Sequence, residues 1–369
     1  MKLALRELVR RPGRFVMATV VLTLIAVLLM FLGGLLDGLT RNATGAVRAQ
    51  NGDVLVYSGA AQSSFLRSRI DPDLRALVSA VDRVTATGGI GIVQLGARVP
   101  GNGPRDLAGV ALFGYEISPR GVPDAPPPGQ AYADEVLKAN GVEQGMELLV
   151  GPARSPITVI GFVSDTAYSG QGGLWTSPQT WREVLAANRP AAQLADGVFQ
   201  ALVVRGNGSP SALAAAIDNA TDGATKSLTV AAAAAATPGV SEQQSTFNQI
   251  IGVTVLIALV VIALFFALLT VERVALYGVL KAIGARSSTI FAGLVVQAAI
   301  VALIASAIAA ALVYAIEALI PPGTVPLYVS TSRVSTSVGV LLLAAVLGCA
   351  FSLRRVLKVD PASALGSAQ

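Results

Sequence analysis

The feature that most constrains this chain is a set of four long apolar runs, because a helix needs about 20 apolar residues to cross the hydrocarbon core of a membrane. The chain has 369 residues, of which 53% are hydrophobic and only 13% are charged. Soluble domains are about one quarter charged, so this composition argues against a simple soluble protein. We predict transmembrane helices at 15–36, 248–271, 290–320 and 334–353.

The first apolar run follows a basic segment and therefore also resembles a secretory signal peptide. Its apolar core of about 20 residues is longer than the usual core of about 7 to 15 residues. The sequence that follows, DGLTRNATG, contains no cleavage site of the A-x-A kind. We therefore expect an uncleaved membrane anchor.

Lysine and arginine flank the apolar runs unevenly, and short basic flanks remain in the cytoplasm. The segment before the first run carries five basic residues and one acid, whereas the loop between the third and fourth runs carries one basic residue. Both termini are therefore predicted to be cytoplasmic. The predicted segments are a cytoplasmic N-terminal helix 1–14, an extracytoplasmic domain 37–247, a cytoplasmic loop 272–289, a short external loop 321–333 and a cytoplasmic tail 354–369.

The N-terminal segment mixes leucine and valine with arginine before a Pro-Gly pair interrupts it. Such a segment can lie along the membrane surface as an amphipathic helix, with its arginines on lipid phosphates. The alternative is a plain basic flank. The residues that we assign to the membrane surface are Arg6, Arg10, Arg11 and Arg14.

The insert between the first two runs has the composition of a soluble domain. Short β-rich runs bounded by Gly, Pro, Asn and Asp predict strands, and helical patterns alternate with them. The expected fold class is a membrane α-helical protein with four transmembrane helices and a large α+β extracytoplasmic domain, in one lobe or two. Predicted strands lie at 52–58, 88–99, 106–117, 146–163 and 199–206, and predicted helices at 71–82, 131–140, 177–188 and 209–220.

Three other segments of the insert have a distinctive composition. The Pro-rich segment 118–130 predicts a loop, since proline supplies no backbone donor. The poly-alanine segment 231–236 fits either a strand edge or a helix. The run SEQQSTFNQ continues into the second apolar run with no breaker after Pro238 and Gly239, which predicts a stalk helix.

The sequence offers no recognisable catalytic chemistry. Histidine is absent and Cys349 is the only cysteine, which excludes His-dependent acid–base catalysis and sites built from paired cysteines and histidines. The segment ATDGATKS comes nearest to a phosphate-binding P-loop but lacks its glycines. We expect no catalytic residue, no cofactor-binding residue and no metal ligand. In the third run, Gln297 is expected to bond to a neighbouring helix and Glu317 to lie at the outer interface.

The segment 272–283 is mixed in character although it lies between two apolar runs. On a helix with about 100° per residue, its larger apolar side chains share one side and its smaller residues share the other. The first side can rest at the membrane boundary, while another protein can approach the second closely. Gly284 is a natural helix stop. A basic hairpin loop without a docking role is the alternative.

The run ERVALYGVLKAIGARSSTI, with VVQAAIVALIA after it, resembles the cytoplasmic loop of the FtsX/MacB-type ABC transporter permeases, which include MacB, LolC/LolE and DevC-like proteins. The C-terminal DPASALG resembles the closing motif of the family, and one span, a large insert and three spans is the family layout. Leu276 stands where the family often has a second glutamate. The matching loop positions are Glu272, Arg273, Gly278, Lys281, Ala282, Gly284 and Ala285, and those of the tail are Asp360, Pro361, Ala364 and Leu365.

The resemblance implies a permease subunit, usually dimeric, in the bacterial plasma (inner) membrane. A separate cytoplasmic ABC ATPase would hold ATP and Mg²⁺, so this chain would be no enzyme and would bind no cofactor and no nucleic acid. The segment 272–283 would be the coupling helix that contacts the ATPase and passes its motion to the outer domain. The residues implied in coupling are Glu272, Arg273, Leu276, Tyr277, Gly278, Leu280, Lys281, Ala282, Gly284 and Ala285.

Two functions fit this resemblance. The first is export or extraction of a lipid, lipoprotein, peptide or drug-like substrate, with an extracytoplasmic adaptor as a further partner. The second is a non-transporting mechanotransmission complex that activates an outer partner such as a cell-wall hydrolase. A receptor or scaffold that works without ATP is a third alternative. The size of the insert favours export.

Overall fold

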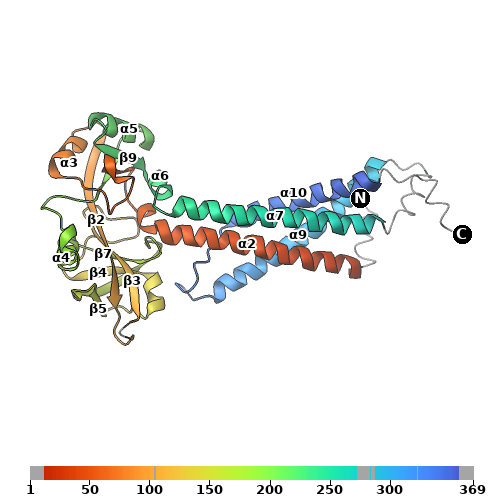
Figure 1. The fold of residues 1–369 in the computed structure, drawn as a ribbon, viewed down its shortest axis with the longest axis horizontal. Coiled ribbons are helices and arrows are strands. Elements are labelled where there is room, and N and C mark those ends of the chain that lie inside the picture. Colours follow the sequence, from red (N-terminus) through yellow and green to blue (C-terminus); the bar gives the residue numbers. More distant parts are fainter. Residues whose placement is uncertain (1–11, 104, 272–282, 284–286, 322, 357–369) are drawn as a thin grey trace. The chain divides into compact units, whose positions relative to one another are not determined.

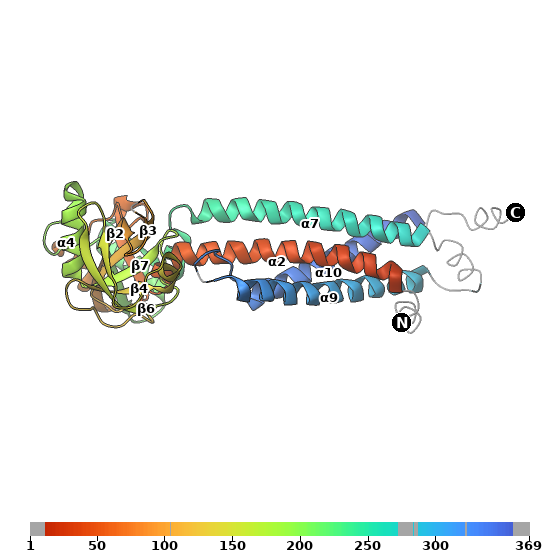
Figure 2. The same ribbon diagram turned by 90° about the horizontal axis from the view of Figure 1, so that it is seen from below.

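The computed structural model describes residues 12–103, 105–271, 283, 287–321 and 323–356. The chain divides into two compact units. One contains the apolar parts of the long helices, and the other is the inserted domain, residues 39–244 together with 321–326. Figures 1 and 2 label the elements of both units.

In the described part of the chain, four helices are long and apolar enough to cross a membrane. They run side by side in Figure 2. Each predicted span falls on one of them, and the expected fold class, four apolar helices with an α+β domain between the first and second, is confirmed. The helices are α2 (Pro12–Arg48), α7 (Val240–Val271), α9 (Ser287–Leu319) and α10 (Thr331–Val356).

Two of these helices extend furthest beyond the predicted spans, and for α7 the extension is the predicted stalk helix. α2 continues past Leu36 to Arg48, and α7 begins at Val240, directly after Gly239 with its φ of 84°. Polar and charged residues such as Arg and Gln are compatible with a helix. The apolar run therefore gives the part of each helix that is suited to lipid, whereas the helix itself continues into polar sequence.

The interior of the helical unit is built from small and apolar side chains. α9 contributes a stripe of alanines that are at most 1% exposed and are spaced by four, three and four residues, which places them on one face. Small residues at such positions let helices approach closely. At Gly348 of α10, an added Cβ would lie 2.8 Å from Ile262 Cγ2 of α7. The buried alanines of α9 are Ala298, Ala302, Ala305 and Ala309.

One mixed sheet forms the centre of the inserted domain. Within the described residues its nine strands follow the order β3-β7-β4-β6-β5-β2-β8-β1-β9, and β3 also pairs with β2. The strands are β1 (Val54–Ser58), β2 (Val84–Arg98), β3 (Leu107–Tyr115), β4 (Gln130–Asp134), β5 (Glu147–Val150), β6 (Ser155–Val163), β7 (Gly172–Thr176), β8 (Ala201–Gly206) and β9 (Thr225–Thr229).

The long strand β2 joins the two halves of this sheet. Residues 84–90 pair with β8, residues 90–98 pair with β3, and the end of the strand also pairs with β5. One half is β2-β8-β1-β9 with the helices α3 (Pro72–Ser79) and α5 (Pro210–Ala220), a βαββαβ arrangement. The other half closes into a ring of strands through the β2–β3 pairing. Because β2 belongs to both halves, the domain is one compact unit and not two separate lobes.

Three predicted helices of the inserted domain, 71–82, 177–188 and 209–220, are confirmed, and each begins directly after a capping residue. Asp71, Ser177 and Ser209 precede α3, α4 (Pro178–Asn188) and α5, and each side-chain oxygen accepts a backbone N–H three residues further on. Each cap is followed by proline at the first helical position. This combination satisfies a backbone donor that the helix itself leaves unpaired.

The helix predicted at 131–140 is wrong. Its first part belongs to β4, and the remainder is a short 3-10 helix, η2 (Glu135–Asn140). β4 pairs with β6 on one side and with β7 on the other, and Ala131 and Ala133 are fully buried. Pairing with the neighbouring strands therefore decides this segment against the helical tendency of its alanines.

The poly-alanine segment, for which the sequence left two alternatives, is the helix α6 (Val230–Ala235), and Thr229 Oγ1 accepts the N–H of Ala232 at its start. Two strands, β7 and β9, have no counterpart in the sequence prediction. Their sequences GGLWT and TKSLT lack a clear alternation of apolar and polar residues. They form because neighbouring strands, β3 and β4 for β7 and β1 for β9, offer them backbone partners.

Tight packing of a tryptophan against glycines joins α4 to the sheet. Trp181 is fully buried, and a Cβ added at Gly91 would lie 2.0 Å from its Cζ2 atom. At Gly114 an added Cβ would lie 2.5 Å from the Cβ of Trp181. Glycine at these strand positions therefore allows the close approach of the helix.

We expect Gly91→Ala to destabilise the inserted domain, because the added methyl group overlaps the indole of Trp181. The expected loss is about 2 kcal/mol, with an unfolding midpoint lower by about 5 °C. The two tryptophans of the chain, Trp175 and Trp181, both lie in this domain, so their fluorescence during heating of the full chain measures its unfolding. Gly103→Ala is the matched control, since nothing lies within 4 Å of an added Cβ there. Equal midpoints for the two variants would contradict the packing argument.

Candidate functional site

The predicted coupling segment lies almost entirely outside the described residues. Of 272–286 only Ile283 is described, with a side chain that is 79% exposed. Among the membrane-surface arginines, Arg14 belongs to α2. The predicted residues outside the described part are Arg6, Arg10, Arg11, Glu272, Arg273, Leu276, Tyr277, Gly278, Leu280, Lys281, Ala282, Gly284 and Ala285.

A polar site that the sequence analysis did not anticipate lies at the end of α2, within the inserted domain. The backbone of α2 here rests directly on the loop 165–170, because a Cβ added at Gly45 would lie 2.8 Å from the carbonyl oxygen of Asp165. Ala46 N–H donates to the carbonyl oxygen of Ala167 at 3.0 Å, and the N–H of Ser169 donates to the carbonyl oxygen of Ala43 at 3.1 Å. Helix and loop are thus joined by main-chain hydrogen bonds in both directions.

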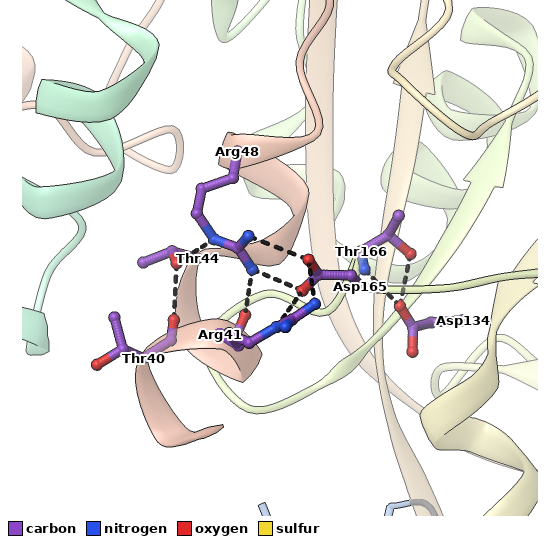
Figure 3. A network of polar contacts seen from close by, with 7 residues as sticks. All are labelled: Thr40, Arg41, Thr44, Arg48, Asp134, Asp165 and Thr166. Carbon is purple, nitrogen blue, oxygen red and sulfur yellow. Dashed lines mark hydrogen bonds and ion pairs between the residues drawn. The ribbon is translucent and has the colours of Figure 1, made fainter. Parts of the chain in front are cut away.

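Two arginines of α2 bind one carboxylate of this loop (Figure 3). Arg41 donates from Nη2 and Nε to Asp165 at 2.7 and 3.2 Å, and Arg48 donates from Nη2 and Nη1 at 2.6 and 3.0 Å. Arg48 Nε also donates to Thr44 Oγ1, which in turn donates to the carbonyl oxygen of Thr40. Both pairs are bidentate, the strongest geometry for arginine and carboxylate. We call Arg41, Arg48 and Asp165 the α2 clamp.

The loop that carries Asp165 is itself fixed to the sheet. Asp165 has a left-handed backbone with φ of 58°, and Thr166 after it is fully buried. Thr166 donates from its backbone N and its Oγ1 to Asp134 Oδ2 at 2.7 and 2.6 Å. Asp134 ends β4, is 1% exposed and accepts the N–H of Val136 with its other oxygen at 2.9 Å. The α2 clamp is therefore connected through one residue to the central sheet (Figure 3).

The pKa values of the two carboxylates, Asp165 and Asp134, are shifted in opposite directions. Burial by itself raises the pKa of Asp165, but hydrogen bonds and positive charge from Arg48 and Arg41 outweigh it, so its pKa lies below the ordinary value. Burial also raises the pKa of Asp134, and here it exceeds the opposing effect of the hydrogen bonds from Thr166 and Val136. Asp165 is therefore held as an anion between two cations.

A second ion pair ties α2 to α10 within the helical unit. Arg333 donates from Nε to Asp37 Oδ2 at 3.1 Å, and its Nη2 also contacts Asp37. Ser330 donates to the same carboxylate at 3.4 Å and accepts the N–H of Arg333 at 3.1 Å, which caps the start of α10. Nearby, Glu317 at the end of α9 accepts the N–H of Val329 at 3.1 Å.

The polar residues of α2 share one stripe of the helix. Asp37, Arg41, Thr44 and Arg48 are separated by four, three and four residues, a spacing that places side chains on one face. The sequence shows this spacing, but the partner of the two arginines is more than 110 residues away along the chain. The arrangement holds a helix end firmly to a sheet, and among the described residues no cluster of three or more His, Cys, Asp or Glu is suited to a metal ion.

We expect Asp165→Asn to lower the unfolding midpoint of the inserted domain, because two guanidinium groups lose their counter-charge. Hydrogen bonds to charged groups suggest a loss of about 2 kcal/mol at neutral pH, measured by tryptophan fluorescence of the full chain during heating. Glu135→Gln is the matched control. It breaks the exposed pair with Lys138, whose side chains are 48% and 47% exposed, and surface pairs contribute less than about 1 kcal/mol.

The difference in unfolding midpoint between wild type and Asp165→Asn should depend on pH, which tests whether the negative charge of Asp165 causes it. Because the pKa of Asp165 is lowered in the folded state, its stabilisation is present above the unfolded value of about 3.9 and is lost as the pH falls through the folded value. The midpoints of wild type and Asp165→Asn should therefore converge in acid. Asp134 is present in both proteins, and the charge of Asp165 is the smallest of the effects on its pKa, so its own titration largely cancels in the comparison. A constant difference down to the lowest pH at which the domain folds would contradict the clamp.

Comparison with known proteins finds a family match over part of the membrane-spanning region of the chain. The family model described as FtsX-like permease C-terminal matches residues 248–361. The chain is 30% identical over 124 residues to "Putative hemin transport system permease protein HrtB" of Staphylococcus haemolyticus (strain JCSC1435), covering 34% of this chain and 35% of that protein. It is 37% identical over 114 residues to an uncharacterized ABC transporter permease of Mycobacterium bovis, covering 30% of this chain and 31% of that protein. The chain therefore matches about a third of the length of these relatives.

Two solved structures are similar over the inserted domain. The periplasmic region of MacB from Actinobacillus actinomycetemcomitans has a TM-score of 0.35 and 12% identity, covering 50% of this chain and 91% of that chain. The extracellular domain of the ABC-type transporter YknZ from Gram-positive bacteria has a TM-score of 0.31 and 11% identity, covering 48% and 100%. The family match covers three of the four long helices, so the membrane region of this chain is similar to the C-terminal part of FtsX-like permeases, and the predicted resemblance to FtsX/MacB-type ABC transporter permeases is confirmed.

Proposed function

We propose that this chain is the permease subunit of an ABC transporter in which a separate ATPase drives movement of the inserted domain. The family match over 248–361 supports the role as permease. The mechanical part of the proposal rests on one observation: α2 is a single helix from Pro12 to Arg48, and its end is held in the inserted domain by the α2 clamp.

The ATPase is proposed to bind at the segment 272–283. This segment lies between α7 and α9, inside the range matched by the family model. Its basic flanks favour the cytoplasm, and its short side chains allow close approach of a partner. ATP and Mg²⁺ would be held by the ATPase, because the sequence of this chain contains no P-loop motif.

Motion is proposed to reach the inserted domain through α2. Within the helical unit, Asp37 links α2 to the start of α10 through Arg333. Within the inserted domain, the α2 clamp and the bonds of Thr166 to Asp134 link the same helix to β4. A helix resists bending because each turn is hydrogen-bonded to the next. Displacement or rotation of α2 therefore moves the loop 165–170 and the sheet with it.

We also propose a sidedness and an assembly for the chain. The inserted domain would lie outside the cytoplasm and both termini inside it, in the bacterial plasma (inner) membrane, as the basic flanks favour. A second permease copy, identical or closely related, would complete the membrane part. α7 offers apolar surface for lipid or for such a copy, since Val253, Leu256 and Leu264 are 58 to 64% exposed.

We propose export or extraction of an amphipathic small molecule or lipid as the transport function. The HrtB relatives carry the name of hemin transport permeases, and hemin is a small molecule with a large apolar surface and carboxylate groups. Activation of an extracytoplasmic partner without transport uses the same coupling segment and the same clamp. The two alternatives differ in whether a substrate is transported or an outer partner is activated. Either result is measured separately from coupling to the ATPase.

Substitutions in the coupling segment test the first step. Gly278→Arg and Leu280→Asp are each expected to lower co-purification of the ATPase and the stimulation of ATP hydrolysis, because a bulky or charged side chain obstructs the proposed docking helix. Arg83→Gln, at an exposed position of the inserted domain, serves as a control that keeps both. Unchanged binding and hydrolysis in the two loop variants would remove the assignment of the coupling segment.

A substitution in the α2 clamp tests the second step, which is the transmission of motion through α2 to the inserted domain. In the wild-type complex, we expect ATP to change hydrogen exchange in the loop 165–170 and in β4. In Asp165→Asn this ATP-dependent change should be lost, while ATPase binding and hydrolysis stay at the wild-type level, because the coupling segment is intact. Glu135→Gln should behave as wild type. An ATP-dependent change that survives in Asp165→Asn would mean that motion reaches the sheet by another route.

A further inference from the structure

A cavity of about 580 Å³ opens on the inserted domain at one end of the closed ring of strands. It is formed where the ends of β2 and β3, the turn between β5 and β6 and the end of α4 meet. None of its lining residues belongs to the α2 clamp. Its volume lies in the range of small-molecule sites, about 300 to 1,000 Å³.

Three arginines from three separate elements line this cavity. Arg98 ends β2, Arg154 lies in the turn between β5 and β6, and Arg189 follows the last residue of α4. No carboxylate lines the cavity, and within the described part of the chain none of the three arginines forms an ion pair. Arg189 donates from Nη2 to the carbonyl oxygen of Gln94 at 3.1 Å, but in the described part of the chain none of the three shares a carboxylate as Arg41 and Arg48 share Asp165. Three converging cations without an acid are suited to an anionic group.

The walls that carry these arginines are fixed by hydrogen bonds. Asn188 accepts the N–H of Ala153 with Oδ1 at 2.8 Å and donates from Nδ2 to Ser155 Oγ at 3.0 Å, which joins the end of α4 to the β5–β6 turn. The N–H of Gly151 donates to the carbonyl oxygen of Gly96 at 2.8 Å. The positions from which the arginines project are therefore set before a ligand arrives, which lowers the entropy lost on binding.

The remaining lining includes apolar surface beside the arginines. Leu107 is 49% exposed, and Leu95 and Pro152 lie on the same cavity. We propose that this cavity binds the acidic headgroup of an anionic amphiphile, a phosphate or carboxylate, with the apolar part of the molecule against Leu107 and Pro152. This proposal goes beyond the proposed permease function and does not depend on it, since binding needs neither the ATPase nor movement of α2.

Hexyl phosphate is a suitable probe, because it combines a phosphate with a short apolar chain. Its binding to the full chain in a neutral detergent is measured by isothermal titration calorimetry. The triple variant R98Q/R154Q/R189Q is expected to bind at least about tenfold more weakly, since it loses several charge-assisted hydrogen bonds. Arg83→Gln removes an exposed arginine outside the cavity and should bind as wild type. Tryptophan unfolding midpoints confirm that each variant folds.

Two further binding measurements distinguish a site for an amphiphile from a site for a free anion. Inorganic phosphate should bind more weakly than hexyl phosphate to the wild type. Leu107→Ala should weaken binding of hexyl phosphate and leave binding of inorganic phosphate unchanged, because only the apolar contact is lost. Equal affinity of wild type and triple variant for hexyl phosphate would overturn the site. Equal affinity of the two probes would overturn the amphiphile and leave a simple anion site.

Discussion

The bond between one carboxylate and two arginines decides how the end of α2 is held. Asp165 of the loop 165–170 has a left-handed backbone, and Arg41 and Arg48 approach it from positions about two turns apart on the helix. The loop would be a weak anchor by itself. Thr166 gives it a second attachment through Asp134, which is buried at the end of β4. Helix, loop and sheet are thereby connected by short, directional bonds.

The clamp is effective because it lies between water and the domain core. Its side chains are about one third exposed, so the charges keep part of their hydration while their attraction is less screened than at a fully exposed site. Complete burial of these three charged groups would cost more desolvation free energy than the attraction within the two ion pairs regains. Asp134 shows the other case: it is buried without a cation, and its pKa is raised.

Two groups of arginines in the inserted domain have opposite surroundings. Arg41 and Arg48 share Asp165, and Arg48 also donates to Thr44 of the same helix. Arg98, Arg154 and Arg189 line a cavity whose lining residues include no acid. The first group stabilises the fold and connects it to α2, whereas the second is suited to a partner from outside the chain. Charge alone does not distinguish the two groups; their neighbours do.

The sequence by itself determined the membrane class, the four apolar helices and three helices of the inserted domain, which begin after Asp71, Ser177 and Ser209. These features depend on local composition and on backbone groups that lipid cannot satisfy. It also contained the family motif that the match over 248–361 supports. The strand at β4 was mistaken for a helix because its identity depends on pairing with β6 and β7.

Only the tertiary structure decided which distant residues meet. The polar spacing on α2 is visible in the sequence, but the loop that supplies Asp165 follows more than 110 residues later. The three cavity arginines likewise come from segments up to 91 residues apart, from position 98 to position 189. Their meeting depends on strand register and on the turn that Asn188 holds, which no local pattern encodes.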